Sequence, residues 1–318
     1  MDSNVWLQPQ VSLRPFCTLR TGGPAEWFAQ ASRVDDLAEI ALQAQSSGRP
    51  MMTIGWGSNL LPSDQGVKGV VVHNAAKSIT FGDDGTVVVD CGAGLQELFL
   101  KTAQRGLAGL SFAVGIPGTV GGALVSNAGA YRSNLSVFVT EIEIVAEGSR
   151  RWVDPAWMEF DYRDSKLRKP NAAPCSLLRV KMKFGAGDRK EIFDQARDFQ
   201  RQRISKQPAP ASAGSFFKNV NDAALAEKIT EMPERIRSAG VVPAGFLLER
   251  VGMAGYRHGG AMLSKKHANF MLNVSGATAT EIRQLANIAR QRVHSEFGVT
   301  LEEEVLYVGE WAEFDQVR

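Results

Sequence analysis

Two glycine-rich stretches have the composition of loops that bind phosphate groups. Residues 115–123 read Gly-Ile-Pro-Gly-Thr-Val-Gly-Gly-Ala, and residues 55–60 read Gly-Trp-Gly-Ser-Asn-Leu. Because glycine has no Cβ, its backbone N–H groups can approach an anion closely and adopt positive φ. The spacing differs from the Gly-x-Gly-x-x-Gly of a Rossmann turn. We therefore expect either a cradle for a diphosphate or merely tight loops.

Ser215 lies in a turn of small residues, after Ala213-Gly214 and before two phenylalanines. Its hydroxyl could simply cap a turn or a helix. A nucleophilic role is weaker, because the sequence has no Gly-x-Ser-x-Gly motif around it and no histidine nearby to act as a base. Serine is a very weak acid, so it can donate a proton only to a strongly basic centre such as a carbanion or an enolate.

Two charged residues also have both a structural and a functional interpretation. Arg163 lies between Asp161 and Asp164, which could satisfy it on a surface turn, or it could bind a carboxylate or phosphate through two parallel hydrogen bonds. Glu304 ends an acidic triplet, which is usually a solvated face. Strand alternation places Glu304 on the same side as Leu306, so its side chain could instead point inward. A buried carboxylate is costly, so such a position would indicate a functional role.

The elements that carry these residues follow from the sequence pattern. A helix is predicted from a cap at Ser32 to Gly48, and the buried strand 51–54 leads directly into the glycine turn at 55–60. With a further strand at 70–72, the first block is of βαβ type with parallel strands. The second block is α+β, with strands at 86–89, 137–145 and 176–184 and a helix at 95–102.

A third block begins after a segment of prolines and small residues at 206–214. Thr278 and Glu281 form a capping box for a long amphipathic helix, and Gly298 ends it. Strands are predicted at 269–274 and 304–308.

Composition excludes several classes of protein. The 318 residues exceed one compact core, and the net charge of +2 with scattered basic residues does not predict nucleic-acid binding. No run of about eighteen apolar residues and no N-terminal signal are present, so we expect a cytoplasmic chain that binds no membrane. Three widely spaced cysteines predict free thiols. No Cys/His spacing suggests a metal site.

Taken together, these motifs resemble the UDP-N-acetylenolpyruvoylglucosamine reductase family, flavoenzymes of peptidoglycan precursor synthesis. The motifs occur in the family's order over nearly the whole chain, and as an ordered set they are highly specific. They comprise residues 19–25, 55–60, 115–123, 127–131, 162–165, 214–219, 255–270 and 301–305.

The resemblance implies an α+β fold, the FAD-binding fold shared with vanillyl-alcohol oxidase (PCMH type), with a C-terminal α/β substrate domain. We expect FAD-binding subdomains at 1–75 and 76–205, the second joined by a C-terminal strand at 300–318, and a substrate-binding domain at 206–299. Because neither glycine turn contains a histidine, the FAD should be non-covalent. The implied FAD contacts are Gly55, Gly57, Ser58, Asn59, Leu60, Gly115, Ile116, Pro117, Gly118, Thr119, Gly121, Gly122, Ala123, Asn127, Gly129, Ala130 and Val180.

The resemblance also implies the reaction. In that family NADPH reduces FAD and leaves, and the enolpyruvyl ether of UDP-N-acetylglucosamine then enters the same site and is reduced to the lactyl ether of UDP-N-acetylmuramate. By position in the motifs, Ser215 donates the proton, while Arg163 and Glu304 polarise the substrate carboxylate and hold the developing enolate. Glu304 would have to be protonated or act through a partner, since two adjacent anions repel.

Substrate contacts map less directly. Those implied are Tyr131, Lys206, Asn219, His267 and Asn269, of which Lys206, His267 and Asn269 also have a plain structural explanation. We expect a monomer.

The chain departs from the family pattern at two positions, with Arg132 where glycine usually stands and Val220 where proline does. The segment 216–270 leaves no room for the extra tyrosine-bearing loop of one family branch. Two alternatives remain: an FAD oxidase of the same fold, and a non-catalytic nucleotide-binding protein.

Overall fold

The computed structural model describes residues 7–208 and 212–311, and its contacts divide the chain into two compact units. Unit 1 contains residues 7–12, 24–57 and 66–205, and unit 2 contains residues 13–23, 58–65 and the described residues from 206 onward. The chain therefore passes between the units five times, once inside the glycine turn at 55–60. Among the described helices, none has the length and apolar character needed to span a bilayer.

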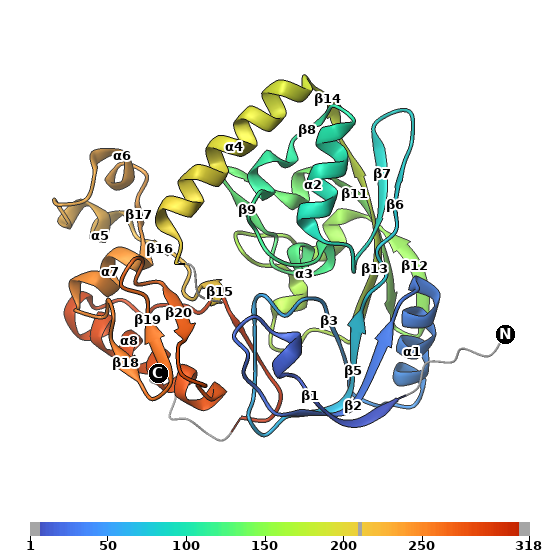
Figure 1. Ribbon diagram of the computed structural model, residues 1–318, viewed down its shortest axis with the longest axis horizontal. Coiled ribbons are helices and arrows are strands. Elements are labelled where there is room, and N and C mark those ends of the chain that lie inside the picture. The colour runs from blue at the N-terminus through green and yellow to red at the C-terminus, as the bar shows by residue number, and fades with distance from the viewer. Residues whose placement is uncertain (1–6, 209–211, 312–318) are drawn as a thin grey trace. The chain divides into compact units, whose positions relative to one another are not determined.

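The first sheet of unit 1 has the order β1-β2-β5-β3 (Figure 1). Its strands are β1 (Gln8–Ser12), β2 (Pro24–Ala31), β3 (Met51–Ile54) and β5 (Val67–Asn74). The predicted parallel pairing is confirmed for β3 and β5. Strand β2, which the sequence analysis did not delimit, also pairs parallel with β5, and β1 adds an antiparallel edge strand.

Helix α1 (Val34–Ser46) connects β2 to β3. The predicted cap at Ser32 is wrong, because the N-cap is Arg33 and makes no side-chain bond. Asp35 and Asp36 in the first turn favour this helix end through the helix dipole instead.

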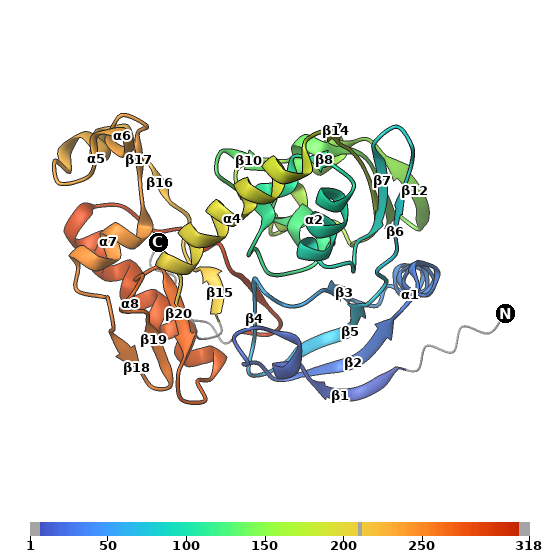
Figure 2. The ribbon, with the colours of Figure 1, turned by 45° about the horizontal axis from the view of Figure 1, so that its top comes forward.

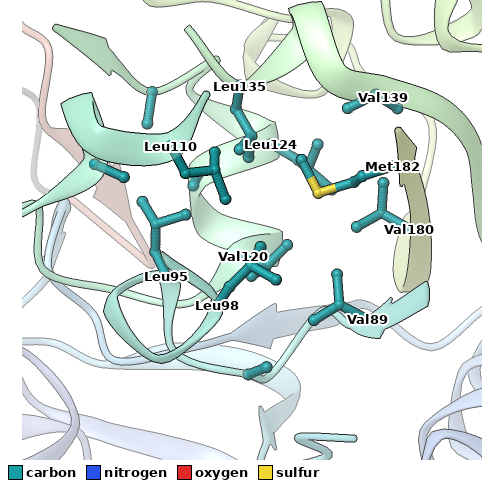
Figure 3. Packing of buried hydrophobic residues seen from close by; sticks show 14 of the residues in the cluster. Val89, Leu95, Leu98, Leu110, Val120, Leu124, Leu135, Val139, Val180 and Met182 are labelled. Atoms are coloured by element: carbon teal, nitrogen blue, oxygen red, sulfur yellow. The ribbon is translucent and has the colours of Figure 1, made fainter. Parts of the chain in front are cut away.

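The second sheet of unit 1 is antiparallel throughout, with the order β12-β11-β13-β7-β6. Helices α2 and α3 lie on the same side of this sheet, as Figures 1 and 2 show. Figure 3 shows the core between them, where Leu98 and Leu124 of the helices approach Val89 and Met182 of the strands. The strands are β6 (Ile79–Phe81), β7 (Thr86–Asp90), β11 (Val139–Ala146), β12 (Ser149–Val153) and β13 (Cys175–Lys183), and the helices of this part are α2 (Leu95–Gln104), α3 (Val120–Val125) and α4 (Arg189–Lys206).

Short elements complete unit 1. They are the strands β8 (Leu107–Ala108), β9 (Gly129–Ala130), β10 (Ser133–Asn134) and β14 (Gly185–Ala186), and the 3-10 turns η2 (Leu110–Ala113), η3 (Leu135–Phe138), η4 (Pro155–Met158) and η5 (Lys166–Arg168). The two sheets share buried contacts, because Val145 and Leu178 of the second sheet pack with the core of α1. The predicted subdomains 1–75 and 76–205 thus carry separate sheets but lie within one unit.

Unit 2 has an antiparallel sheet of order β15-β20-β19-β18, so it is α+β rather than the α/β arrangement that the sequence suggested. The predicted capping box of Thr278 and Glu281 is confirmed at the start of α8, and Gly298 ends that helix with φ +70°. The elements are η1 (Arg14–Phe16), β15 (Ser212–Ser215), β16 (Val220–Asn221), α5 (Ala223–Lys228), α6 (Glu234–Arg237), β17 (Val241–Val242), α7 (Ala244–Arg250), β18 (Arg257–His258), β19 (Ala261–Leu263), β20 (Phe270–Asn273) and α8 (Ala279–Phe297).

The C-terminal strand pairs differently from the prediction. Strand β21 (Leu306–Val308) runs parallel to β4 (Leu60–Pro62), which follows the glycine turn, and both lie in unit 2. It does not join the sheet of residues 76–205, because Leu61 and Val305 are buried in the core of unit 2. Residues 312–318 of the predicted strand 300–318 lie outside the described part of the chain.

Candidate active site

The two predicted phosphate-binding turns meet within unit 1. Strand β3 ends at Ile54, and the next residue, Gly55, packs against Thr119 at the start of α3. A Cβ on Gly55 would lie 2.8 Å from the Thr119 methyl carbon and closer still to its hydroxyl. The absence of a side chain therefore allows the two turns to touch.

Thr119 and its neighbours present backbone donors that the protein leaves unused. The Thr119 hydroxyl caps α3 by accepting from the Gly122 N–H at 3.3 Å, and the Gly121 N–H donates to the Cys91 carbonyl at 2.8 Å. Within the described residues, the N–H groups of Gly118 and Thr119 donate to no protein atom. Adjacent N–H groups without a partner beside a glycine turn can receive an anion, so this stretch fits a phosphate.

The segment that follows α3 is held in a strained backbone conformation. Asn127, Tyr131 and Arg132 have φ of +40°, +52° and +65°, values that residues with a Cβ rarely adopt. Asn127 is buried, and its amide donates to the Asp161 carbonyl at 3.0 Å while its oxygen accepts from Ser136 N–H at 3.2 Å. The glycine usual at position 132 would adopt this φ without strain.

Arg163 lies at the tip of a tight turn, with φ +52°. Paired backbone bonds of 3.1 and 3.3 Å between Asp161 and Asp164 close this turn. The Arg163 guanidinium donates to the carbonyl of Gly129, while Asp164 pairs with Lys169 at 2.5 Å. Arg163 is therefore directed at the predicted cofactor segment, and a strained residue in this place is typical of functional sites.

The structure adds Arg203, on α4, to this region of unit 1. Its Cδ lies 3.1 Å from the position of a Cβ on Gly115, and its guanidinium lies 5.7 Å from the centre of the Tyr131 ring. Its Nε is buried and has no hydrogen-bond partner in the described part of the chain. Burial lowers the pKa of Arg203, and the positive charge of Arg163 lowers it further. A half-buried cation with an unused donor is suited to an anionic ligand.

Tyr131 is fixed by the same helix. Its ring stacks on Phe199 with centroids 3.7 Å apart, and its hydroxyl donates to the Phe199 carbonyl at 3.0 Å. The sequence pattern of α4, with its many charged residues, reads as a solvated helix and gives no signal for Arg203.

The side chain of Val180, an expected cofactor contact, lies in the protein core. It is fully buried on β13 and packs in the core of unit 1. The alternation of β13 turns Arg179 and Lys181 outward and Val180 inward, so Val180 offers no surface to a ligand.

Ser215 and Glu304 are brought together within unit 2. Ser215 ends β15, and the next residue, Phe216, accepts a hydrogen bond from the Glu304 N–H at 2.8 Å. Phe217 forms a β-bridge with Glu303. The Ser215 hydroxyl is half-buried and makes no hydrogen bond to any described residue, so it remains available as a donor.

The glycine turn and Glu304 are also connected. The amide of Asn59 donates to the Glu304 carbonyl at 3.0 Å, and the Asn59 carbonyl accepts from Leu306 N–H at 3.0 Å. These two bonds continue the β4–β21 ladder. The predicted cofactor residue Asn59 thus fixes the backbone of the predicted catalytic residue Glu304.

The acidic triplet separates into three roles. Glu302 is exposed and pairs with Lys218 at 2.6 Å, whereas Glu303 pairs with Arg290 of α8 at 3.1 Å. Glu304 is half-buried and fastened through its backbone as described above. The simple interpretation of the triplet as a solvated face therefore holds for Glu302 alone.

The other predicted substrate contacts hold unit 2 together. The Asn219 oxygen accepts from Ala244 N–H at the start of α7, at 3.2 Å. The His267 ring packs against Gly245, where a Cβ would lie 2.7 Å from its Cε1. Asn269 is 3 % exposed and bonds to Phe217. Lys206 ends α4, and its side chain lies outside the described residues.

Comparisons with known proteins agree with this division of the chain. The sequence pattern of the FAD binding domain matches residues 25–152, and that of the UDP-N-acetylenolpyruvoylglucosamine reductase C-terminal domain matches residues 205–308. The UDP-N-acetylenolpyruvoylglucosamine reductase of Synechococcus sp. is 34 % identical over 95 % of this chain and 91 % of its own. The enzyme of that name from Acaryochloris marina is 35 % identical over 98 % of this chain and 95 % of its own.

The chain belongs to the UDP-N-acetylenolpyruvoylglucosamine reductase family. A crystal structure of UDP-N-acetylenolpyruvylglucosamine reductase from Thermus caldophilus is similar, with a TM-score of 0.75, 29 % identity, and coverage of 96 % of this chain and 99 % of that one. The chain is thus an oxidoreductase with an FAD-binding domain of the α+β type, as the sequence resemblance implied. Two touching glycine turns and unused N–H donors are what a bound FAD diphosphate would need.

Proposed function

We propose that this chain reduces the enolpyruvyl ether of UDP-N-acetylenolpyruvoylglucosamine to the lactyl ether of UDP-N-acetylmuramate, with NADPH as the electron donor. The observation that carries the proposal is the placement of Ser215 and Glu304 on adjacent backbone segments of the reductase-specific unit, where the Glu304 N–H donates to the carbonyl of Phe216, the residue after Ser215. When bound, FAD would accept a hydride from NADPH and deliver it to the methylene carbon of the substrate.

Each of the three polar residues has a role set by the charge that develops. Addition of hydride to the methylene carbon places negative charge on the adjacent carbon and on the carboxylate. Arg163 would bind that carboxylate through its guanidinium, and Glu304, protonated or acting through a partner, would hold the developing enolate. Ser215 would donate its proton to the adjacent carbon, because its hydroxyl is uncommitted within the described residues.

The cofactor cradle would consist of the turns in unit 1 and the backbone that follows them. Gly118 and Thr119 would donate their N–H groups to the diphosphate, and Gly55 would allow the close approach of the two turns. Arg203, supported by Tyr131, would bind a phosphate or carboxylate of the incoming substrates. No histidine occurs in either turn, which supports a non-covalent FAD.

The finer features of the proposal follow from the same chemistry. NADPH and the UDP-sugar would use one site in alternation, as the absence of a separate Rossmann turn from the sequence suggests. Three free thiols suit a reducing compartment, so we propose that the protein acts in the cytoplasm, and as a monomer.

An anaerobic mixing experiment tests the proposal. The purified protein is loaded with FAD, bleached with one equivalent of NADPH, and then mixed with UDP-N-acetylenolpyruvoylglucosamine. The flavin absorbance should return within the turnover time, and mass spectrometry should find the lactyl product. Bleached flavin that the substrate does not reoxidise would contradict the assignment.

A further inference from the structure

The backbone beside Ser215 is held from both edges within unit 2. On one edge, the N–H groups of Lys218 and Glu304 bond to Glu302 and Phe216 respectively, both at 2.8 Å. The other edge faces β20, but regular pairing of β15 with β20 is limited to Ser212 with Leu272 and Ser215 with Phe270. Beyond Ser215 one more backbone bond follows, from the Phe216 N–H to the carbonyl of Asn269 just before β20, and backbone pairing stops there.

Asn269 continues the ladder where backbone pairing stops. Its side-chain oxygen accepts from the Phe217 N–H at 3.0 Å, and its side-chain nitrogen donates to the Phe217 carbonyl at 2.9 Å. Its own carbonyl accepts from the Phe216 N–H at 2.8 Å. The amide carries one acceptor and a donor in a plane, as a peptide does, so it substitutes for a missing strand residue.

This arrangement leaves the Asn269 amide little to offer a substrate. The residue is 3 % exposed, and both polar atoms of its side chain are engaged with Phe217, which is itself 1 % exposed. A buried amide of this kind fixes the position of the backbone, because any conformation that leaves its donor or acceptor without a partner costs free energy.

We propose that Asn269 is a positioning residue that fixes the Ser215 hydroxyl for proton transfer, rather than a substrate contact. This inference rests on the proposed function. The three bonds hold residues 216 and 217, which adjoin Ser215 and carry the bond to Glu304. Loosening them would displace the donor Ser215 and the backbone of Glu304 together. A displacement of about 1 Å costs a positioned reaction about 10²-fold.

Asn273, on the same strand, provides a matched control. Its amide also joins two backbone groups, donating to the Leu19 carbonyl and accepting from Ala277 N–H, both at 2.8 Å. It has no contact with residues 215–217 among its recorded bonds. Asn269→Asp and Asn273→Asp each convert one amide donor into an oxygen that faces a carbonyl.

The test measures both half-reactions of the FAD-loaded variants in anaerobic stopped flow. Asn269→Asp should slow the substrate half-reaction at saturation by about tenfold to a hundredfold, with unchanged substrate affinity and unchanged flavin reduction by NADPH. Amide hydrogen exchange over residues 216–218 should accelerate in Asn269→Asp alone. Asn273→Asp should lower the melting temperature but leave both half-reactions intact. If Asn269→Asp does not fold, Asn269→Ser is measured in the same way.

Three results would overturn the inference. The first is a weaker substrate affinity of Asn269→Asp with an unchanged limiting rate, which would indicate a direct contact. The second is an equal loss of rate in both half-reactions of Asn269→Asp. The third is the same kinetic loss in Asn273→Asp. Failure of the unaltered protein to reoxidise with substrate would instead contradict the proposed function.

Discussion

The two units place their candidate functional groups by different means. In unit 1 the cradle is made of backbone, with glycines where turns touch and left-handed residues at Asn127, Tyr131, Arg132 and Arg163. In unit 2 the key groups are two side chains, Ser215 and Glu304, on segments fastened by regular hydrogen bonds. The FAD-binding pattern covers the first arrangement except for Arg163, and the reductase-specific pattern covers the second. The difference supports our proposal that the cradle holds the cofactor, while Ser215 and Glu304 of unit 2 act with Arg163 of unit 1 in the reaction that follows.

Removal of the proposed proton donor should have the largest effect and tests whether unit 2 supplies chemistry rather than cofactor binding. Ser215→Ala should slow the substrate half-reaction by about 10²- to 10⁴-fold, the usual contribution of a general acid, and leave flavin reduction by NADPH unchanged. Ser212→Ala, on the same strand, is the control, since within the described residues its hydroxyl bonds to the Gly214 N–H alone, at 3.4 Å. Stopped-flow absorbance measures both steps. Equal losses in the two steps would show that Ser215 supports the cofactor.

The cradle can be tested by closing the gap between its turns. A Cβ in Gly55→Ala would lie 2.8 and 3.1 Å from carbon atoms of Thr119, whose hydroxyl is committed to capping α3. Overpacking of this kind costs about 1–3 kcal/mol, so FAD binding should weaken by up to about a hundredfold. Gly185→Ala, which meets no atom within 4 Å, should bind FAD normally. Fluorescence titration measures the affinities, and normal binding by Gly55→Ala would argue against the cradle.

A charged cluster on β11 and β13 should contribute stability and no chemistry. Glu143 is 5 % exposed, and burial alone would raise its pKa, but hydrogen bonds from Arg179 at 2.6 Å and Arg150 at 2.8 Å outweigh burial and lower the pKa. Glu143→Gln should therefore lower the free energy of unfolding by about 1.5–3 kcal/mol at pH 7.

The pH dependence of that loss follows from the sign of the shift. Stabilisation by a group with a lowered pKa is present above its unfolded pKa and disappears as the pH falls through the folded pKa. Urea unfolding at pH 7 and at about pH 3 should show the difference between Glu143→Gln and the unaltered protein shrinking. Glu141→Gln, on the same strand but 42 % exposed, should cost less than about 1 kcal/mol. A constant difference at both pH values would contradict the ion-pair origin.

The smallest expected effect concerns Arg203. Arg203→Leu should raise the KM for an anionic substrate about tenfold, because a half-buried cation with an unused donor is removed. Its melting temperature should stay equal or rise, since burial disfavours the charge. The control is Arg201→Leu, on the same helix and 73 % exposed. An unchanged KM for both NADPH and the UDP-sugar would remove Arg203 from the site.

Local signals in the sequence predicted much of this arrangement. The glycine turns, the capping box of α8 and the alternation of β13 depend on residues close together in the chain, so their patterns are readable. The parallel direction of β2 and β3 in one sheet also follows from α1, a helix of crossover length between them.

Contacts between residues far apart in the chain could not be predicted from the sequence. The parallel pairing of β21 with β4 joins residues about 245 positions apart, and no local pattern specifies that register. The roles of Arg203 and Asn269 likewise depend on what lies opposite them in the fold. On α4, Arg203 is one of many charged residues, and only its burial distinguishes it. The sequence presents Asn269 as a possible substrate contact, and only the fold shows that its amide pairs with Phe217.

The most direct test of the division between cradle and chemistry is the FAD dissociation constant of four proteins. These are the unaltered protein, Gly55→Ala, Ser215→Ala and the double variant, each titrated with FAD under identical conditions. The account predicts that Ser215→Ala binds FAD within about twofold of the unaltered protein, and that the double variant matches Gly55→Ala. A loss of FAD affinity in Ser215→Ala as large as that in Gly55→Ala would contradict it.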